Sequence, residues 1–228
     1  MDIVYPIGKG SRYNNFELRM SLRSLEKHLS NMGNVWIIGE KPDWIQNMNH
    51  IHKHDINTVP DRNMMEKLKL ACETPEISED FLMVHDDHYL LADFDADTLP
   101  YYYSEDLTQY VTRRFDQGYG QRAKNSLQYL TEKKLPTLYF DIHYPIRYNK
   151  KKFLEVIPTM PWGTTKQGFI IKSVYANSAR VLPSFEVDYK INRIPPPECK
   201  VLSTYPHIRH EVKNYLSATF TTPSRYEK

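Results

Sequence analysis

The chain is poor in cysteine, has little net charge and has no long apolar run. Cys72 and Cys199 stand alone without Cys-x-x-Cys spacing, so neither a disulfide framework nor a zinc knuckle is indicated. A net charge of +2 is too small to mark a nucleic-acid binder. No apolar stretch approaches the length of a membrane span, and there is no internal repeat or low-complexity linker.

The remaining composition is that of an ordinary soluble protein. Its 228 residues suit one domain, which we place at 1–228, and they can bury a sizeable core without disulfides. The 40% hydrophobic and 25% charged contents agree with this class. The first residues enter a strand-like segment without a signal peptide, so we expect a location in the cytoplasm of a bacterium or of a phage-infected host.

The first half of the chain alternates between strand-like and helical patterns. Leucines at positions 18, 22, 25 and 29 have helical spacing, with Asn14 or Asn15 as a possible cap. We expect strands at 3–7, 35–39, 50–55 and 81–84, and helices at 16–29 and 61–72. This alternation predicts a three-layer α/β sandwich with a mainly parallel sheet, in which ligands bind beyond the carboxyl ends of the strands.

The second half is less regular. We expect helices at 107–114, 122–133 and 150–157, strands at 138–142 and 168–171, and an exposed aromatic loop at 100–103. Consecutive prolines at 195–197 break regular structure and predict a tail packed over the core. The basic runs 113–114 and 150–152 are either solvated surface or contacts to a phosphate backbone.

The most informative segment places two carboxylates directly after an apolar run. Phe81–Val84 reads as a buried strand, and Asp86 and Asp87 follow it between His85 and His88. Buried charge is costly unless it is paired or bound to a cation, and carboxylates with imidazoles suit magnesium or manganese. We therefore expect a metal site for a nucleotide-sugar diphosphate at Asp86, Asp87 and His88. The alternative is a polar turn between two strands.

Two basic segments are candidates for phosphate binding. The loop Gly8-Lys9-Gly10-Ser11-Arg12 combines close backbone approach with cations, although a plain turn fits equally well. Arg19 and Arg23 lie four residues apart on one helical face and have the donor geometry to clamp a diphosphate. The alternative for this pair is surface ion pairing with Glu26 or other acids.

Histidines and acids recur elsewhere along the chain. His50, His52 and His54 alternate, so in a strand they share one face that either binds zinc or forms a sheet edge. Asp141 and His143 repeat the acid–histidine theme, as a base and as a metal or phosphate contact, or as structural hydrogen-bonding groups. Trp162-Gly163-Thr164-Thr165 is a candidate acceptor loop. Glu186 and Asp188 are further candidate bases.

In order along residues 2–175, the chain resembles the stealth family of sugar-phosphate transferases. The segments that carry the resemblance are Asp2-Ile3-Val4-Tyr5, the helical run 17–27, Val35-Trp36-Ile37-Ile38, Pro42-Asp43-Trp44, His54-Asp55-Ile56, Ile77–Phe81 with His85-Asp86-Asp87, His143-Tyr144-Pro145 and 150–153. The chain departs from the family at 5–8, where a tryptophan-containing segment is usual, and at 59–63. These departures bear on phosphotransfer chemistry more than on the fold.

The resemblance implies a GT-A-type glycosyltransferase core that uses a nucleotide-sugar and a divalent cation. It implies that Asp86 and Asp87 hold the metal and diphosphate, that Arg19 and Arg23 lie near the donor, and that His143 belongs to the active site. The compact chain also resembles small bacteriophage glycosyltransferases, some of which modify hydroxymethylated DNA bases. We expect residues 1–92 to bind the nucleotide-sugar, and 93–228 to hold the acceptor region and C-terminal tail.

The leading hypothesis is transfer of a sugar from a nucleotide-sugar, taken as a uridine diphosphate sugar, to a hydroxyl of a modified DNA base or a surface polysaccharide. Mn²⁺ or Mg²⁺ would bridge the diphosphate, Lys67 would add a phosphate contact, and Asp141 or Asp188 would act as base. The alternatives are a stealth-type sugar-1-phosphate transferase, a non-catalytic nucleotide-sugar-binding module and a zinc-dependent hydrolase built on the histidines.

Overall fold

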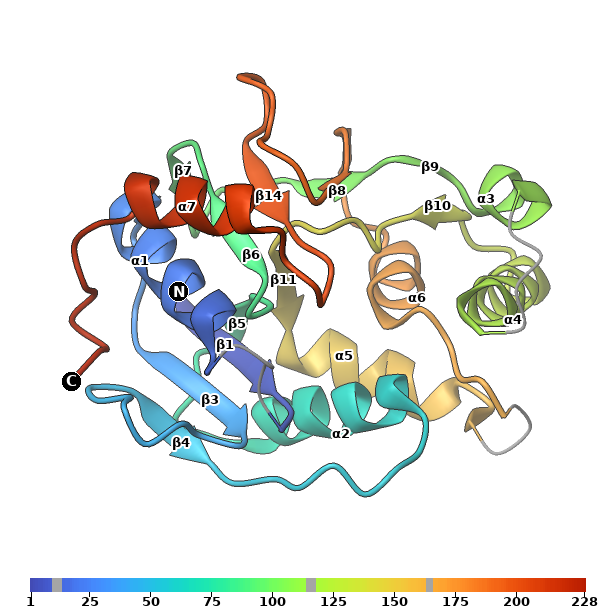
Figure 1. The fold of residues 1–228 in the computed structure, drawn as a ribbon. Coiled ribbons are helices and arrows are strands. Elements are labelled where there is room, and N and C mark those ends of the chain that lie inside the picture. The colour runs from blue at the N-terminus through green and yellow to red at the C-terminus, as the bar shows by residue number, and fades with distance from the viewer. Residues whose placement is uncertain (10–13, 114–117, 163–165) are drawn as a thin grey trace.

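A five-stranded, mainly parallel sheet forms the centre of the molecule. The computed structural model describes residues 1–9, 14–113, 118–162 and 166–228 (Figure 1). The sheet order is β11-β5-β1-β3-β4, with β1 parallel to β3 and β5, β3 parallel to β4, and β11 antiparallel to β5. These strands are β1 (Asp2–Ile7), β3 (Val35–Gly39), β4 (Asn49–Ile51), β5 (Asp80–Met83) and β11 (Ile146–Asn149). The expected mixed α/β fold is confirmed.

The inner strands are buried from end to end because helices cover both faces of the sheet. Every residue of β1 and of β3 is buried, which explains why both read as continuous apolar runs. The helices α1 (Phe16–His28) and α2 (Pro60–Glu73) lie on opposite sides of this sheet (Figure 1). The crossover from β1 to β3 through α1 and the crossover from β4 to β5 through α2 run in opposite directions across the sheet, and right-handed connections then place the two helices on opposite faces. The carboxyl ends of β1 and β5 therefore flank a topological switch point.

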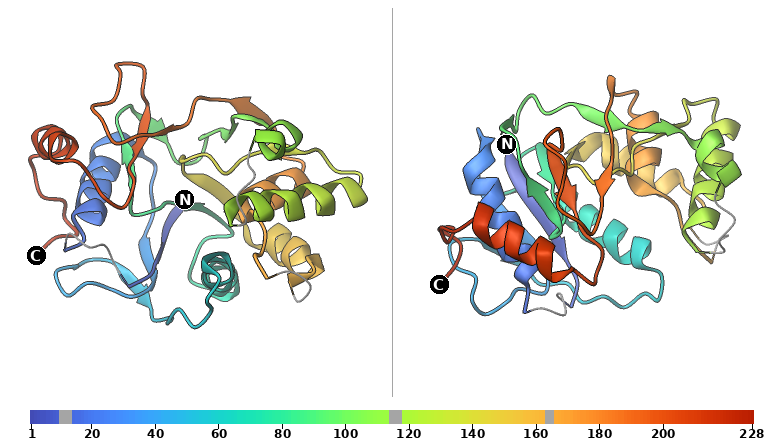
Figure 2. Two further views of the ribbon diagram at one scale, coloured as in Figure 1. Left: turned by 45° about the vertical axis from the view of Figure 1, so that its right-hand side comes forward. Right: turned by 45° about the horizontal axis from the view of Figure 1, so that its top comes forward.

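Among the described residues, the second half contains more helices than the first, and its strands span at most 4 residues. Its helices are α3 (Leu107–Arg113), α4 (Tyr119–Glu132), α5 (Lys150–Val156), the 3₁₀ turn η1 (Ile157–Thr159), α6 (Ile171–Ser178) and α7 (His210–Thr219). The α7 helix lies against α1 in both views (Figures 1 and 2), where Val212 and Leu216 pack with Met20 of α1. The tail after the prolines is thus held by an apolar contact with the first helix.

Small sheets complete the fold. β6 (His88–Leu90) pairs with β14 (Val201–Ser203), which pairs with β13 (Tyr189–Lys190). The other pairs are β2 (Leu29–Ser30) with β7 (Phe94–Asp95), β9 (Glu105–Asp106) with β10 (Leu138–Tyr139), and β8 (Tyr101–Tyr103) with β12 (Pro183–Phe185). The β13–β14–β6 sheet matters most for function, because it brings residue 190 beside the acidic turn that precedes β6.

Several sequence-based expectations for single elements are wrong. Residues 168–170 are not a strand, and Ile171 begins α6, in which Ile171–Asn177 are all buried, so its polar residues do not form the exposed face that marks a surface helix in sequence. Tyr101–Tyr103 is not an exposed loop, because it forms β8 and its rings pack on Tyr144 and Phe140. The ladder of β4 ends at Ile51, and that of β10 ends at Tyr139. Within the described ranges, no helix combines the length and apolarity needed to cross a membrane.

Candidate functional site

A cavity of about 430 Å³ lies where the two halves of the chain meet, and we call it the acidic cavity. Its walls come from the first turns of α1 and α2, from the turn after β5, and from loops of the second half. Its charged and polar lining residues are Glu17, Asp61, His85, Asp86, Asp87, Tyr119, Asp141, His143, Lys172, Lys190, Thr204 and Tyr205. The sequence-predicted Asp86, Asp87, Asp141 and His143 are thus brought together.

The twin acids lie in a turn that is fixed at both ends. The amide of Val84 donates to the carbonyl of Val4 at 3.0 Å, so this residue still lies against β1. Ser21 of α1 donates to the carbonyl of His85 at 3.3 Å. On the far side, β6 pairs with β14 through His88 and Ser203. A polar turn between two strands is therefore present, and it directs Asp86 and Asp87 into the cavity.

The two neighbouring carboxyls have opposite electrostatic environments. Burial, followed by the charges of Asp87 and Glu17, raises the pKa of Asp86 to about 7. Burial also disfavours the charged form of Asp87, but the charge of Lys190 and those of the nearby histidines outweigh it and lower its pKa. Ser203 adds a hydrogen bond to Asp87 Oδ2 at 2.7 Å. Asp87 is therefore the anion of the pair in this arrangement.

His143 is oriented by Asp188 and contacts Lys190. Its Nδ1 lies 2.9 Å from Asp188 Oδ2, and its backbone amide donates to Asp188 Oδ1 at 3.0 Å. Lys190 Nζ lies 3.0 Å from His143 Nε2 and 3.5 Å from Asp87 Oδ2. Because an ammonium only donates, this network assigns the imidazole proton to Nδ1 and leaves Nε2 with a lone pair facing Lys190.

The buried ammonium of Lys172 supports the loop that carries His143. Lys172 of α6 donates to the carbonyl of Ile142 at 2.9 Å and to that of Tyr144 at 3.1 Å. Burial lowers the pKa of Lys172, and the negative charges of Asp141 and Asp188 oppose that effect. The ammonium thus supports the loop and also supplies positive charge beneath the acidic cavity.

A second acidic pair lies in the same cavity. Asp141 accepts a hydrogen bond from Tyr119, and Asp61 of α2 forms an ion pair with Arg122 at 2.9 Å. Burial raises the pKa of Asp61 to about 7, with a further contribution from the charge of Asp141, against the opposing effect of Arg122. A carboxyl with this pKa exchanges protons near neutral pH, which is a property of general bases.

Two predicted residues occupy supporting rather than lining positions. Asp188 hydrogen-bonds His143, and this contact outweighs the effect of burial and lowers the pKa of Asp188. His88 is fully buried and is not among the described residues that line the cavity. Its Nδ1 accepts from the amide of His85 at 3.4 Å, and its Nε2 has no hydrogen-bond partner among the described residues. His85, not His88, is the histidine of this turn that lines the cavity.

The candidate phosphate-binding loop lies beside an ion pair at the carboxyl end of β1. Lys67 donates to the carbonyl of Ile7 at 2.8 Å and pairs with Asp55 at 2.6 Å. A Cβ on Gly8 would lie 3.0 Å from Asp55 Oδ2, so this position favours glycine. Lys9 is exposed, and Gly8, Lys9 and Lys67 are not among the described residues that line the cavity. The predicted residues Gly10, Ser11 and Arg12 lie outside the described ranges, as do 163–165 of the candidate acceptor loop.

The structure places Arg19 and Arg23 at the C-terminal tail. Arg23 forms a two-point ion pair with Glu227, with distances of 2.7 and 2.8 Å, and Arg19 adds a contact of 3.1 Å. Arg19 also stacks on Trp44 at 3.8 Å. Burial raises the pKa of Glu227, but the two arginines outweigh this effect and lower the pKa to about 2. This geometry matches the ion-pair alternative, with Glu227 in the place of Glu26.

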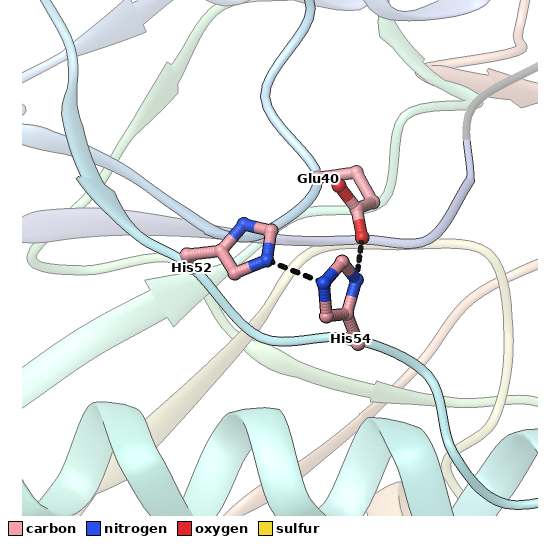
Figure 3. Close-up of side chains that lie close together, drawn as sticks. All are labelled: Glu40, His52 and His54. Carbon is pink, nitrogen blue, oxygen red and sulfur yellow. Dashed lines mark hydrogen bonds and ion pairs between the residues drawn. The ribbon is translucent and has the colours of Figure 1, made fainter.

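The alternating histidines separate into one structural residue and a pair. His50 Nε2 lies 2.9 Å from the carbonyl of Gly39. His52 Nε2 lies 2.9 Å from His54 Nε2, and His54 Nδ1 lies 2.5 Å from Glu40 Oε1 (Figure 3). The pair therefore joins with Glu40 of the loop after β3, and His50 does not take part.

Among the residues that line the acidic cavity, sequence reasoning missed Glu17, Asp61, Tyr119, Lys172 and Lys190. Each lies in a different element, so no spacing in the sequence connects them. Within the basic runs, Lys150 is buried and donates to the carbonyl of Thr74 at 2.5 Å, and Arg113 pairs with Glu105, while Lys151 and Lys152 are exposed. Neither Lys150 nor Arg113 is free for a phosphate backbone.

The acidic cavity contains the donor types that suit a hard divalent cation, but in this arrangement Asp86, Asp87 and His143 do not bring their ligand atoms within 4.8 Å of one another. It offers the carboxylates of Asp86 and Asp87 and the Nε2 lone pair of His143, and Lys190 already places one positive charge between Asp87 and His143. The raised pKa of Asp86 reflects burial first and then the negative charges of Asp87 and Glu17, and a nearby cation would oppose both effects. Oxygen ligands with one imidazole suit Mn²⁺ or Mg²⁺.

Comparison with known proteins gives a fold and no family. No family model and no curated protein sequence matches the chain. Among solved structures, it is similar to the galactosyltransferase LgtC in complex with donor and acceptor sugar analogues, with a TM-score of 0.53 and 12% identity over 99% of this chain and 98% of that one. An active-site mutant of LgtC aligns with 12% identity over the same shares and a TM-score of 0.49. The chain thus has the GT-A-type fold of this enzyme.

Proposed function

We propose that this protein is a metal-dependent glycosyltransferase that moves a sugar from a nucleotide-sugar to a hydroxyl acceptor. One observation carries the proposal: Asp86, Asp87 and His143 converge on a cavity beside the carboxyl end of β5. In open α/β sheets this edge is where ligands bind. The fold that supplies the edge is shared with a galactosyltransferase whose structure contains donor and acceptor sugar analogues.

The donor pyrophosphate and a cation account for the charges of the acidic cavity. Asp86, Asp87 and His143 would hold Mn²⁺ or Mg²⁺, which stabilises negative charge on the leaving nucleotide when bound. The first turns of α1 and α2 reach the cavity through Glu17 and Pro60, and the positive ends of helices favour anions. Lys190 adds an ammonium within reach of the same anion.

The chain's own residues divide the work of proton transfer and positioning. Asp188 holds the His143 ring through Nδ1, so that Nε2 points toward Lys190, which also lines the acidic cavity. Asp141, oriented by Tyr119, accepts the proton of the attacking hydroxyl. Asp61, with its pKa of about 7, interacts electrostatically with Asp141, so the protonation of one carboxyl affects the other.

The acceptor that fits these surfaces is a carbohydrate. Tyr205 lines the cavity, is half exposed and lies 5.8 Å from Lys190 Nζ, so it presents a ring on which a sugar can stack. A modified DNA base would need phosphate contacts from clustered cations, yet Lys150 and Arg113 already have partners within the chain. A surface polysaccharide is therefore the acceptor class we favour.

Calorimetric titration with a uridine diphosphate sugar, with and without Mn²⁺, tests donor binding. We expect binding that requires the cation and is lost in Asp86→Asn. Incubation with oligosaccharide and hydroxymethylated DNA acceptors then tests the reaction. Release of a nucleoside diphosphate supports glycosyl transfer, and release of a nucleoside monophosphate indicates sugar-1-phosphate transfer instead. Binding without turnover on any acceptor would identify a non-catalytic module.

A further inference from the structure

We propose that Glu40, His52 and His54 form a second metal site, for a first-row divalent transition metal such as zinc. One nitrogen from each histidine and one carboxylate oxygen all lie within 4.8 Å of one another (Figure 3). None of the three is among the described residues that line the acidic cavity. The site is therefore independent of the proposed donor site.

The geometry of the two imidazoles is close to that of a bound pair of ligands. His52 and His54 are two residues apart in the extended segment after β4, so their side chains project to the same side. Their Nε2 atoms lie 2.9 Å apart, so the two nitrogens share a single proton in one hydrogen bond. Zinc ligated by two imidazoles at about 2.0–2.1 Å needs a nitrogen separation of roughly 3.3 Å, so a small opening admits the ion in place of the proton.

Neighbouring groups orient this pair. Glu40 Oε1 lies 2.5 Å from His54 Nδ1, so the carboxylate takes the Nδ1 proton and leaves Nε2 as the ligating atom. His50 packs edge-on against His52 with ring centroids 5.9 Å apart, while its own Nε2 is bonded to Gly39. The side chain of His54 is 70% exposed, which leaves room for water to complete the coordination. Two imidazole ligands, one of them held by a carboxylate through its other nitrogen, favour zinc, copper or nickel over magnesium or calcium.

Metal binding here would join two segments on the way to α2. Glu40 follows β3, and His54 precedes Asp55, whose carboxylate pairs with Lys67 of α2 at 2.6 Å. The first turn of α2 carries Asp61 into the acidic cavity. A metal ion held by His52 and His54, with Glu40 hydrogen-bonded to His54, would therefore restrain the segment that positions one wall of that cavity.

Zinc titration of chelator-treated protein, by calorimetry, tests the site. We expect one zinc ion per chain, an affinity loss of at least about 30-fold in His52→Asn and in His54→Asn, and a loss of roughly 10–100-fold in Glu40→Gln. His210→Asn, which changes an exposed histidine of α7, is the matched control and should bind as the wild type does. Asp87→Asn should keep this zinc ion even where it loses the manganese of the acidic cavity.

Cobalt(II) gives a second measurement, because its visible absorption reports nitrogen coordination directly. We expect wild-type protein and His210→Asn to develop that absorption, and His52→Asn not to. Circular dichroism establishes that each variant is folded. Failure of the wild type to bind zinc, or an unchanged isotherm in both folded histidine variants, would overturn the proposal.

Discussion

The two halves of the chain are built differently and contribute different parts of one site. Residues 1–92 form the parallel strands of the central sheet and the helices α1 and α2, whereas the described part of 93–228 forms α-helices of 7 to 14 residues and strands of two to four residues (Figure 2). The first half supplies Asp86 and Asp87, and the second supplies Asp141, His143 and Lys190. The comparison teaches that the regular half provides a rigid platform, while the irregular half provides the groups that set its charge.

The means of support also differ between the halves. The acidic turn is held between β5 and β6, whose own residues beyond Asp80 are buried. The loop of His143 depends instead on single side chains, namely Lys172, Asp188 and the backbone groups they bond. Strand pairing fixes the acidic turn through many contacts. We therefore expect a single substitution in the second half to disturb the geometry of the site more, and one in the first half to change its charge more.

The largest effect should come from the platform itself. Asp87→Asn removes the anion that accepts from Ser203 and Lys190, and charge-assisted contacts contribute about 1.5–3 kcal/mol each. We expect manganese-dependent donor affinity to fall by at least roughly 100-fold, about 2.7 kcal/mol, in calorimetric titration. Asp93→Asn, whose side chain is 91% exposed, is the control. Equal titration heats in wild type and Asp87→Asn would remove Asp87 from the donor site.

The next effect should come from the support of His143. Asp188→Asn keeps the side-chain shape but removes the charge that fixes the ring through Nδ1, and we expect a loss of roughly 10–100-fold in manganese affinity. Asp188→Glu should restore part of it. Glu186→Gln, two residues earlier and paired with Lys200, is the matched control. If Asp188→Asn lowers only thermal stability while manganese affinity is retained, Asp188 has a structural role alone.

A gain of affinity is expected at Lys190. Its ammonium lies among the groups that we assign to the cation, 3.0 Å from His143 Nε2, so it competes with a bound metal. Lys190→Met should tighten manganese binding in the absence of donor by about tenfold, or 1.4 kcal/mol, as measured by electron paramagnetic resonance of free Mn²⁺. Lys200→Met is the control. A weakened affinity in Lys190→Met would show that the ammonium does not occupy the metal position.

The smallest effect should be a pH-dependent change of stability at Asp61. Folding raises the pKa of Asp61 from its ordinary 3.8 to about 7, so its neutral form stabilises the fold below pH 4 and this contribution is lost as the pH rises through 7. Asp61→Asn should therefore be more stable than wild type at pH 8, by on the order of 1 kcal/mol after Arg122 loses its ion pair.

Thermal unfolding from pH 4 to pH 8 measures this difference. The advantage of Asp61→Asn should disappear toward pH 4, and Asp43→Asn, on an exposed residue, should show no such trend. A constant difference between Asp61→Asn and wild type at all pH values would contradict the raised pKa.

The regular half could be predicted because its signals are local. The spacing of Leu18, Leu22 and Leu25 marks α1, and the apolar run before Asp86 marks β5, so both elements and the acidic turn follow from the sequence. The carboxyl-edge rule for parallel sheets then places Asp86 and Asp87 in a site. Helix α6 escaped prediction because its polar residues Lys172, Ser173 and Asn177 are buried and bonded to other elements, so they do not mark a solvent-facing side, and strand β8 escaped because it pairs with a strand some eighty residues away.

Residue chemistry alone determined that this chain carries a carboxylate pair at the end of a buried strand, within an α/β sheet of ordinary pattern. Only the tertiary structure decided that Lys190 and His143 meet Asp87, that Asp61 joins Asp141, and that Arg19 and Arg23 pair with Glu227. The physical reason is that strand and helix periodicity arise from neighbours along the chain. Each of these interactions instead joins residues far apart in sequence, and no regular spacing connects them.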